Sequence, residues 1–149
     1  MKPAGLGRSL LVAAYAIGAS ALACSGPAAT PSRSSAAPVT VTYTYTAATT
    51  QPPGSILVTL SNFQFTPATF ALPAGKVVLY LVNTSNSDHD LILRQPARSV
   101  VAVVAKSEIV HAGQSGTLTI DALPAGIYRA TCGIENHSGL GMVADLTVQ

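Results

Sequence analysis

The chain has 149 residues, enough for one domain with a tail, and it is apolar and weakly charged. Only 9% of its residues are charged, tryptophan is absent, and Lys2 and Arg8 account for the formal net charge of +2. The six remaining Lys and Arg residues balance six Asp and Glu residues. The sequence therefore has no basic patch, and we expect no nucleic-acid partner.

The N-terminal residues have the pattern of a secretory signal peptide. Lys2 and Arg8 precede an apolar run, Ser9–Ala23, that ends in small residues. This run is short for a permanent membrane-spanning helix. We therefore predict that residues 1–23 are a signal peptide that is removed on export.

The residue that follows, Cys24, is a candidate site of lipid attachment. Residues 21–24 resemble a bacterial lipobox, with Ala21 at the position where Leu is usual. We expect lipidated Cys24 to tether the protein to the membrane outside the cytoplasm, in the periplasm or at the cell surface. Ordinary cleavage and secretion is the alternative. If Cys24 carries lipid, Cys132 has no disulfide partner, and a bound metal is one way to protect its thiol.

Residues 24–54 are rich in Ser, Thr, Ala and Pro, and we interpret them as a disordered linker. Inside this stretch, Val39–Thr46 alternates with a period of two residues. The alternation is compatible with an added edge strand and equally with an extended polar stalk.

From Ser55 onward, short strand patterns are separated by turn residues, and no segment has a sustained helical period. The predicted strands are Ser55–Leu60, Thr69–Leu72, Lys76–Asn83, His89–Leu93, Val100–Val104, Glu108–His111, Thr117–Asp121, Ile127–Cys132 and Met142–Val148. This pattern predicts that residues 55–149 form an all-β domain, a β-sandwich with Greek-key connections.

Strand alternation places two sulfur atoms on the interior side of this sandwich. Cys132 ends one predicted strand and Met142 begins the next, and both have the parity of the inward-facing residues. If these strands form an antiparallel hairpin, the two sulfurs meet at one end of the sandwich. His137 then lies near the apex of the loop, with four residues separating it from each sulfur ligand.

A second imidazole has the same parity further upstream. His89 begins a predicted strand after a polar turn and shares its face with Leu91 and Leu93. Two His, one Cys and one Met form the ligand set of a blue-copper electron-transfer site. We therefore predict a metal site at His89, Cys132, His137 and Met142.

The span from Lys76 to Val148 resembles the cupredoxin family, which includes plastocyanin, azurin and rusticyanin-type proteins. The resemblance is carried by "NTSNSDHDLIL", "LPAGIYRATC" and "CGIENHSGLGM". The C-x4-H-x4-M spacing is most similar to that of rusticyanin and sulfocyanin. The resemblance implies that Cys132 supplies the thiolate ligand, His89 and His137 the imidazoles, and Met142 the axial thioether.

The resemblance also implies a function. We expect one copper ion that alternates between Cu(I) and Cu(II) in a monomeric one-electron carrier, with redox proteins docking near His137 and Leu140. The alternative is a copper delivery or sequestration protein. We do not expect an enzyme, because the chain has only three histidines and no second cysteine in the loop for a binuclear centre.

Three positions depart from the family pattern. Glu135-Asn136 stands where Pro-Gly is common before the loop histidine, Asp90 stands where Asn is frequent, and Gly133 stands where a hydroxyl residue often follows the cysteine. An acidic residue near copper is expected to favour Cu(II). His111 precedes a hairpin-like loop and is interpreted as a surface residue.

Overall fold

The computed structural model describes residues 41–96 and 101–149, and this part of the chain is all β. Its strands are β1 (Tyr43–Ala47), β2 (Ile56–Ser61), β3 (Gln64–Thr66), β4 (Thr69–Leu72), β5 (Gly75–Asn83), β6 (Ile92–Pro96), β7 (Val101–Lys106), β8 (Ser115–Leu123), β9 (Gly126–Thr131) and β10 (Val143–Val148). No helix within the described ranges is long and apolar enough to cross a membrane.

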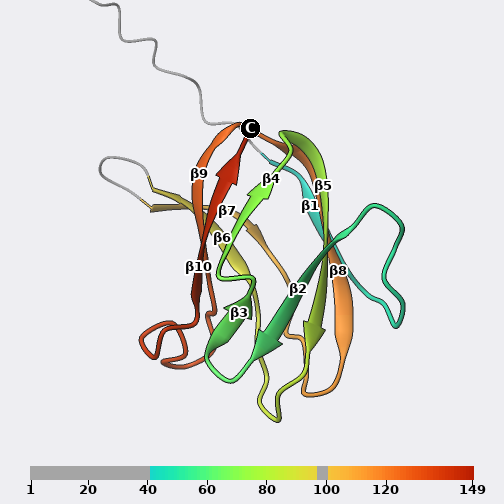
Figure 1. Cartoon of the computed structure of the whole chain (residues 1–149), viewed down its shortest axis with the longest axis vertical. Helices are drawn as coiled ribbons and strands as arrows, with labels where there is room; N and C mark the ends of the chain where they lie inside the picture. The colour runs from blue at the N-terminus through green and yellow to red at the C-terminus, as the bar shows by residue number, and fades with distance from the viewer. Residues whose placement is uncertain (1–40, 97–100) are drawn as a thin grey trace, which may run out of the picture. The chain divides into compact units, whose positions relative to one another are not determined.

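The strands form two five-stranded sheets that face each other (Figure 1), in the orders β1-β8-β5-β2-β3 and β4-β10-β9-β6-β7. Most neighbours are antiparallel, while β2 pairs with β5 and β4 pairs with β10 in parallel. Strands that are distant in sequence are therefore neighbours in both sheets. The predicted β-sandwich is confirmed.

The core lies between the sheets, because alternate residues of each strand point inward. The fully buried apolar side chains include Val58, Leu60, Leu79, Leu81, Leu118 and Ile120 from the first sheet, and Leu93, Tyr128, Ala130, Ala144 and Leu146 from the second. Each large apolar side chain contributes about 1.5–3 kcal/mol through burial. The core therefore gives the loops at the sandwich ends a rigid base.

Two strand predictions need correction, and one strand was not predicted. Glu108–His111 is not a strand, because Val110 makes only a single bridge, with His89. Strand β6 begins at Ile92 instead of His89. The N–H of Leu91 donates to the Ser107 hydroxyl, where a continued strand would have a backbone carbonyl as the acceptor. The three-residue strand β3 was not predicted.

The structure also decides between the two interpretations of Val39–Thr46. Residues Tyr43–Ala47 form β1, which pairs with β8 at the edge of the first sheet, so this part of the expected linker belongs to the sandwich. The signal peptide at residues 1–23, the lipid site at Cys24 and the first part of the linker lie outside the described residues.

Candidate metal centre

The hairpin of β9 and β10 positions the two sulfur-bearing side chains. Thr131 pairs with Val143, and the next residue along, Cys132, donates its N–H to the carbonyl of Met142 at 3.2 Å. Cys132 and Met142 therefore stand opposite each other at the end of the hairpin where the connecting loop begins. Both are buried, with exposed fractions of 2% and 0%. The predicted pairing at one end of the sandwich is confirmed.

The loop between these residues turns back and brings His137 to the same end. His137 accepts a hydrogen bond from the N–H of Met142 at 3.0 Å and donates its own N–H to the carbonyl of Ile134 at 3.0 Å. These bonds fix the backbone of His137 relative to the hairpin. Its side chain is buried, with the residue 8% exposed.

His89 reaches the site from the segment between β5 and β6. Its N–H donates to the carbonyl of Val110 at 3.2 Å, and the N–H of Val110 donates to the carbonyl of His89 at 2.7 Å. Its outer ring nitrogen, Nε2, lies 2.9 Å from Ser85 Oγ. With Nδ1 directed at the site, Nε2–H donates to Ser85, a contact that fixes the tautomer needed for a metal ligand.

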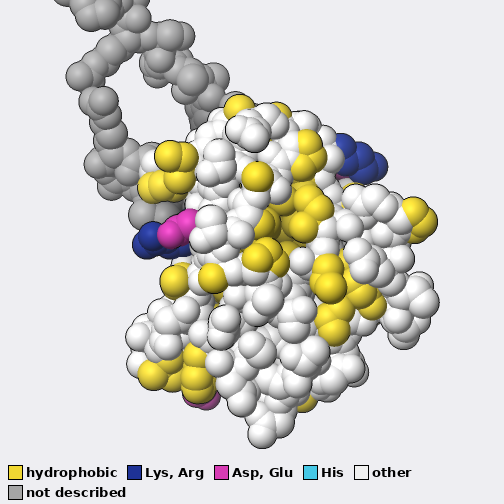
Figure 2. Space-filling model, viewed as in Figure 1, with side chains coloured by type: hydrophobic (Ala, Val, Ile, Leu, Met, Phe, Trp, Pro, Cys, Tyr) yellow, Lys and Arg dark blue, Asp and Glu magenta, His cyan; other side chains and the backbone are white. Residues whose placement is uncertain are grey.

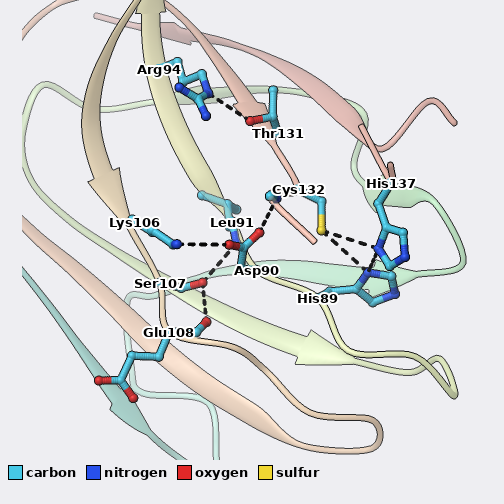
Figure 3. Close-up of polar contacts among 11 residues, drawn as sticks. His89, Asp90, Leu91, Arg94, Lys106, Ser107, Glu108, Thr131, Cys132 and His137 are labelled. Atoms are coloured by element: carbon cyan, nitrogen blue, oxygen red, sulfur yellow. Dashed lines mark hydrogen bonds and ion pairs between the residues drawn. The ribbon is translucent and has the colours of Figure 1, made fainter. Parts of the chain in front are cut away.

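Three of the four predicted ligand residues bring their donor atoms together (Figure 3). Nδ1 of His89 and Nδ1 of His137 are 3.2 Å apart, and Cys132 Sγ lies 3.8 Å from the first and 3.6 Å from the second. First-row metal ions bond imidazole nitrogen at roughly 2.0 Å and thiolate sulfur at about 2.3 Å. Donor atoms that lie 3.2–3.8 Å apart can therefore all reach one such ion, and this donor set suits copper.

Burial sets the charge state of these donors before a metal binds. It raises the pKa of the Cys132 thiol above its ordinary value. The pKa of His89 is lowered, mainly by burial and to a smaller extent by the neighbouring His137. The metal-free site consequently holds a neutral thiol and a neutral His89, and metal binding must release the thiol proton.

A buried carboxylate joins the two ligand segments. Asp90, next to His89, accepts a hydrogen bond from the N–H of Gly133, next to Cys132, and its other oxygen lies 3.6 Å from Lys106 Nζ. Asp90 is only 2% exposed. The residue where Asn was expected therefore still links the two segments, and it adds a negative charge.

Gly133 allows this link because it lacks a side chain. A Cβ at this position would lie 2.6 Å from Ile92 Cδ1 and 3.0 Å from Asp90 Oδ2. Such approaches are too close for carbon, so even a small side chain would displace the carboxylate or the isoleucine. A hydroxyl residue at this position would therefore require the Ile92 side chain or the Asp90 carboxylate to move.

Sequence reasoning missed two residues that contact the ligands, Ser85 on His89 and Phe63 on His137. Ser85 could have been suspected from the polar turn before His89, whereas Phe63 is distant in sequence from every ligand.

His111, expected at the surface, is exposed and pairs with Asp88 at 2.9 Å. On the face seen in Figure 2, apolar side chains lie among polar groups.

Comparison with known proteins gives a family and a fold. The family model described as "Cupredoxin-like domain" matches residues 16–144 of the chain. No curated protein matches the sequence.

Several solved structures resemble the fold. Auracyanin B shares 21% identity, with 72% of this chain and 97% of that chain covered and a TM-score of 0.58. Auracyanin A of Chloroflexus aurantiacus, a "blue" copper protein, shares 20% identity over 64% of this chain and 100% of its own, with a TM-score of 0.53. A Cu(I) form of an amicyanin variant shares 18% identity over 74% of this chain and 100% of its own, with a TM-score of 0.54.

Proposed function

This chain belongs to the cupredoxin-like domain family, and as a blue copper protein it takes one copper ion as its cofactor; we propose that it is a one-electron carrier that works outside the cytoplasm, tethered to a membrane. In this proposal His89, Cys132 and His137 would be the strong copper ligands and Met142 would be a fourth, weak ligand. The observation that carries the proposal is the buried triangle of two imidazole nitrogens and one sulfur, with sides of 3.2–3.8 Å.

When bound, copper supplies the one-electron change between Cu(II) and Cu(I). The protein supplies donors that suit both states, since thiolate and thioether sulfurs favour Cu(I) and imidazoles bind either. The hairpin, the Asp90–Gly133 bond and the His89–Val110 bridge hold the donors in place. Little rearrangement is then needed when the electron arrives or leaves, which favours fast transfer.

Electrons would enter and leave through the edge of His137. Of the three triangle residues it is the most exposed, at 8%, against 2% for Cys132 and 0% for His89. Leu140, three residues further along the loop, is 56% exposed. An apolar surface of this kind suits the small, short-lived contacts that redox partners make, so we propose that such proteins dock near His137 and Leu140.

A copper delivery protein is the competing function, and electrochemistry separates the two. Cyclic voltammetry of the copper-loaded full chain should give a reversible one-electron couple whose amplitude persists over repeated cycles in the presence of a Cu(I) chelator. An amplitude that falls as copper passes to the chelator would favour delivery and contradict the carrier. We also propose that the protein is not an enzyme, because the chain has only three histidines and no second cysteine in the loop.

A further inference from the structure

We infer that Phe63 is a positioning residue for His137: its ring fixes the orientation of the imidazole and covers part of it from water. The inference rests on the proposed role of His137 as a copper ligand. It assigns a function to a turn between β2 and β3 that contributes no ligand itself.

The two histidines are held in different ways. Nε2 of His89 has a hydrogen-bond partner in Ser85 Oγ, whose hydroxyl in turn donates to Asn83 Oδ1 at 2.8 Å. Within the described residues, Nε2 of His137 has no such partner. A ligand ring without a hydrogen bond on its outer nitrogen needs some other contact to fix its orientation.

Phe63 provides that contact from the opposite sheet. Its ring centroid lies 4.9 Å from that of His137, with the planes at 70°, an edge-to-face arrangement. Pairs of this kind contribute about 0.5–1.5 kcal/mol beyond the area that they bury. His89 lies against the same imidazole, with ring centroids 5.0 Å apart. The imidazole of His137 is thus held between a second ligand and an aromatic ring.

The backbone conformation at Phe63 is unfavourable for an aromatic residue, which indicates that the side chain has a role of its own. Asn62 and Phe63 form the two-residue turn that joins Ser61 of β2 to Gln64 of β3. Phe63 has a φ of 56°, a conformation that disfavours a bulky residue and suits Gly or Asn. An aromatic residue at this φ therefore stabilises the turn less than glycine would. The contact of its ring with His137 offsets this loss of turn stability.

The first test uses the metal-free full chain. Diethyl pyrocarbonate acylates accessible imidazoles, and peptide mass spectrometry resolves His89, His111 and His137. We expect Phe63→Leu, which keeps apolar bulk but removes the ring, to raise the reaction rate of His137 several-fold. Tyr43→Leu is the matched control, since Tyr43 is an aromatic residue of similar exposure, 43% against 38%, on the edge strand β1. It should leave the rate unchanged.

The second test uses the copper-loaded full chain and two variants. Phe63→Leu and Phe63→Gly should both change the copper hyperfine splitting in the Cu(II) EPR spectrum. Phe63→Gly removes the turn strain as well, so its thermal midpoint should fall less than the loss of an aromatic side chain alone would produce. A purely structural role would lower the midpoint and leave both the EPR spectrum and the His137 rate as in the unaltered protein.

The outcomes separate this inference from the proposed function. If the unaltered protein has no thiolate–copper absorption, the proposed function fails, and the acylation rates still report whether Phe63 covers His137. If that absorption is present but neither Phe63 variant changes the His137 rate or the EPR spectrum, the positioning role is wrong.

Discussion

At the scale of single residues, Asp90 influences the donors without being a proposed ligand. Its carboxylate is buried, accepts the Gly133 N–H and faces Lys106. A hydrogen-bond acceptor here holds the Cys132 segment in register with His89. A negative charge here also stabilises the higher charge of Cu(II). The two effects can be separated by substitution.

Asp90→Asn keeps an acceptor oxygen and removes the charge. We expect this variant to fold, bind copper and show a higher reduction potential, by roughly 40 mV for each 1 kcal/mol of lost preference for Cu(II). Asp90→Ala should in addition lose about 1 kcal/mol of stability, because the Gly133 N–H loses its acceptor. Voltammetry and thermal unfolding measure both quantities. Asp145→Asn, at an exposed carboxylate paired with Arg129, is the control. An unchanged potential in Asp90→Asn would contradict the charge effect.

Met142 is fully buried opposite Cys132, so it could be a weak ligand or simply part of the core. Met142→Leu conserves volume and should change the free energy of unfolding of the metal-free protein by less than about 1.5 kcal/mol. If the thioether is a ligand, its removal should raise the reduction potential, because three remaining donors suit Cu(I) better than Cu(II), and this effect outweighs the loss of a soft sulfur. Equal potentials in the two proteins would assign Met142 to the core alone.

At the scale of elements, the β9–β10 hairpin shows what the sequence could predict. Alternation within a strand is local, so the parity of Cys132 and Met142 follows from the residues next to them. The Asp90–Gly133 bond and the Phe63–His137 contact join segments far apart in the chain, and no local pattern encodes them. The prediction of a strand at Glu108–His111 was wrong for a related reason. Its residues have a strand-like pattern, but only Val110 makes a bridge, with His89, and no neighbouring strand runs alongside them.

The edge strand β1 offers an element-scale prediction that is independent of copper. The Tyr45 ring of β1 lies over Gly116 of β8, where a Cβ would overlap it. Gly116→Ala should displace Tyr45 and lower the free energy of unfolding by about 1–3 kcal/mol. Hydrogen exchange should show faster exchange in β1, while the copper spectrum stays unchanged. A changed spectrum would mean that β1 is coupled to the copper site.

At the scale of the whole molecule, the sandwich carries its candidate copper site on loops at one end, and the proposed lipid site, Cys24, precedes the domain in the sequence. A lipid at Cys24 would hold such a domain at a membrane, where its redox partners would be. Phase partition in a mild detergent tests the tether. Expressed in a bacterial host, the full chain should enter the detergent phase, and Cys24→Ala should stay in the aqueous phase. A protein that is aqueous in both forms would support secretion instead.

Titration of the metal-free full chain with Cu(II) asks whether Cys132, with His89 and His137, holds one copper ion. We expect an intense visible thiolate-to-copper band that saturates at one equivalent of copper. Cys132→Ser should abolish the band, and Cys24→Ser should leave it unchanged. If the protein binds copper without this band, or if the band survives Cys132→Ser, then Cys132 is not a copper ligand.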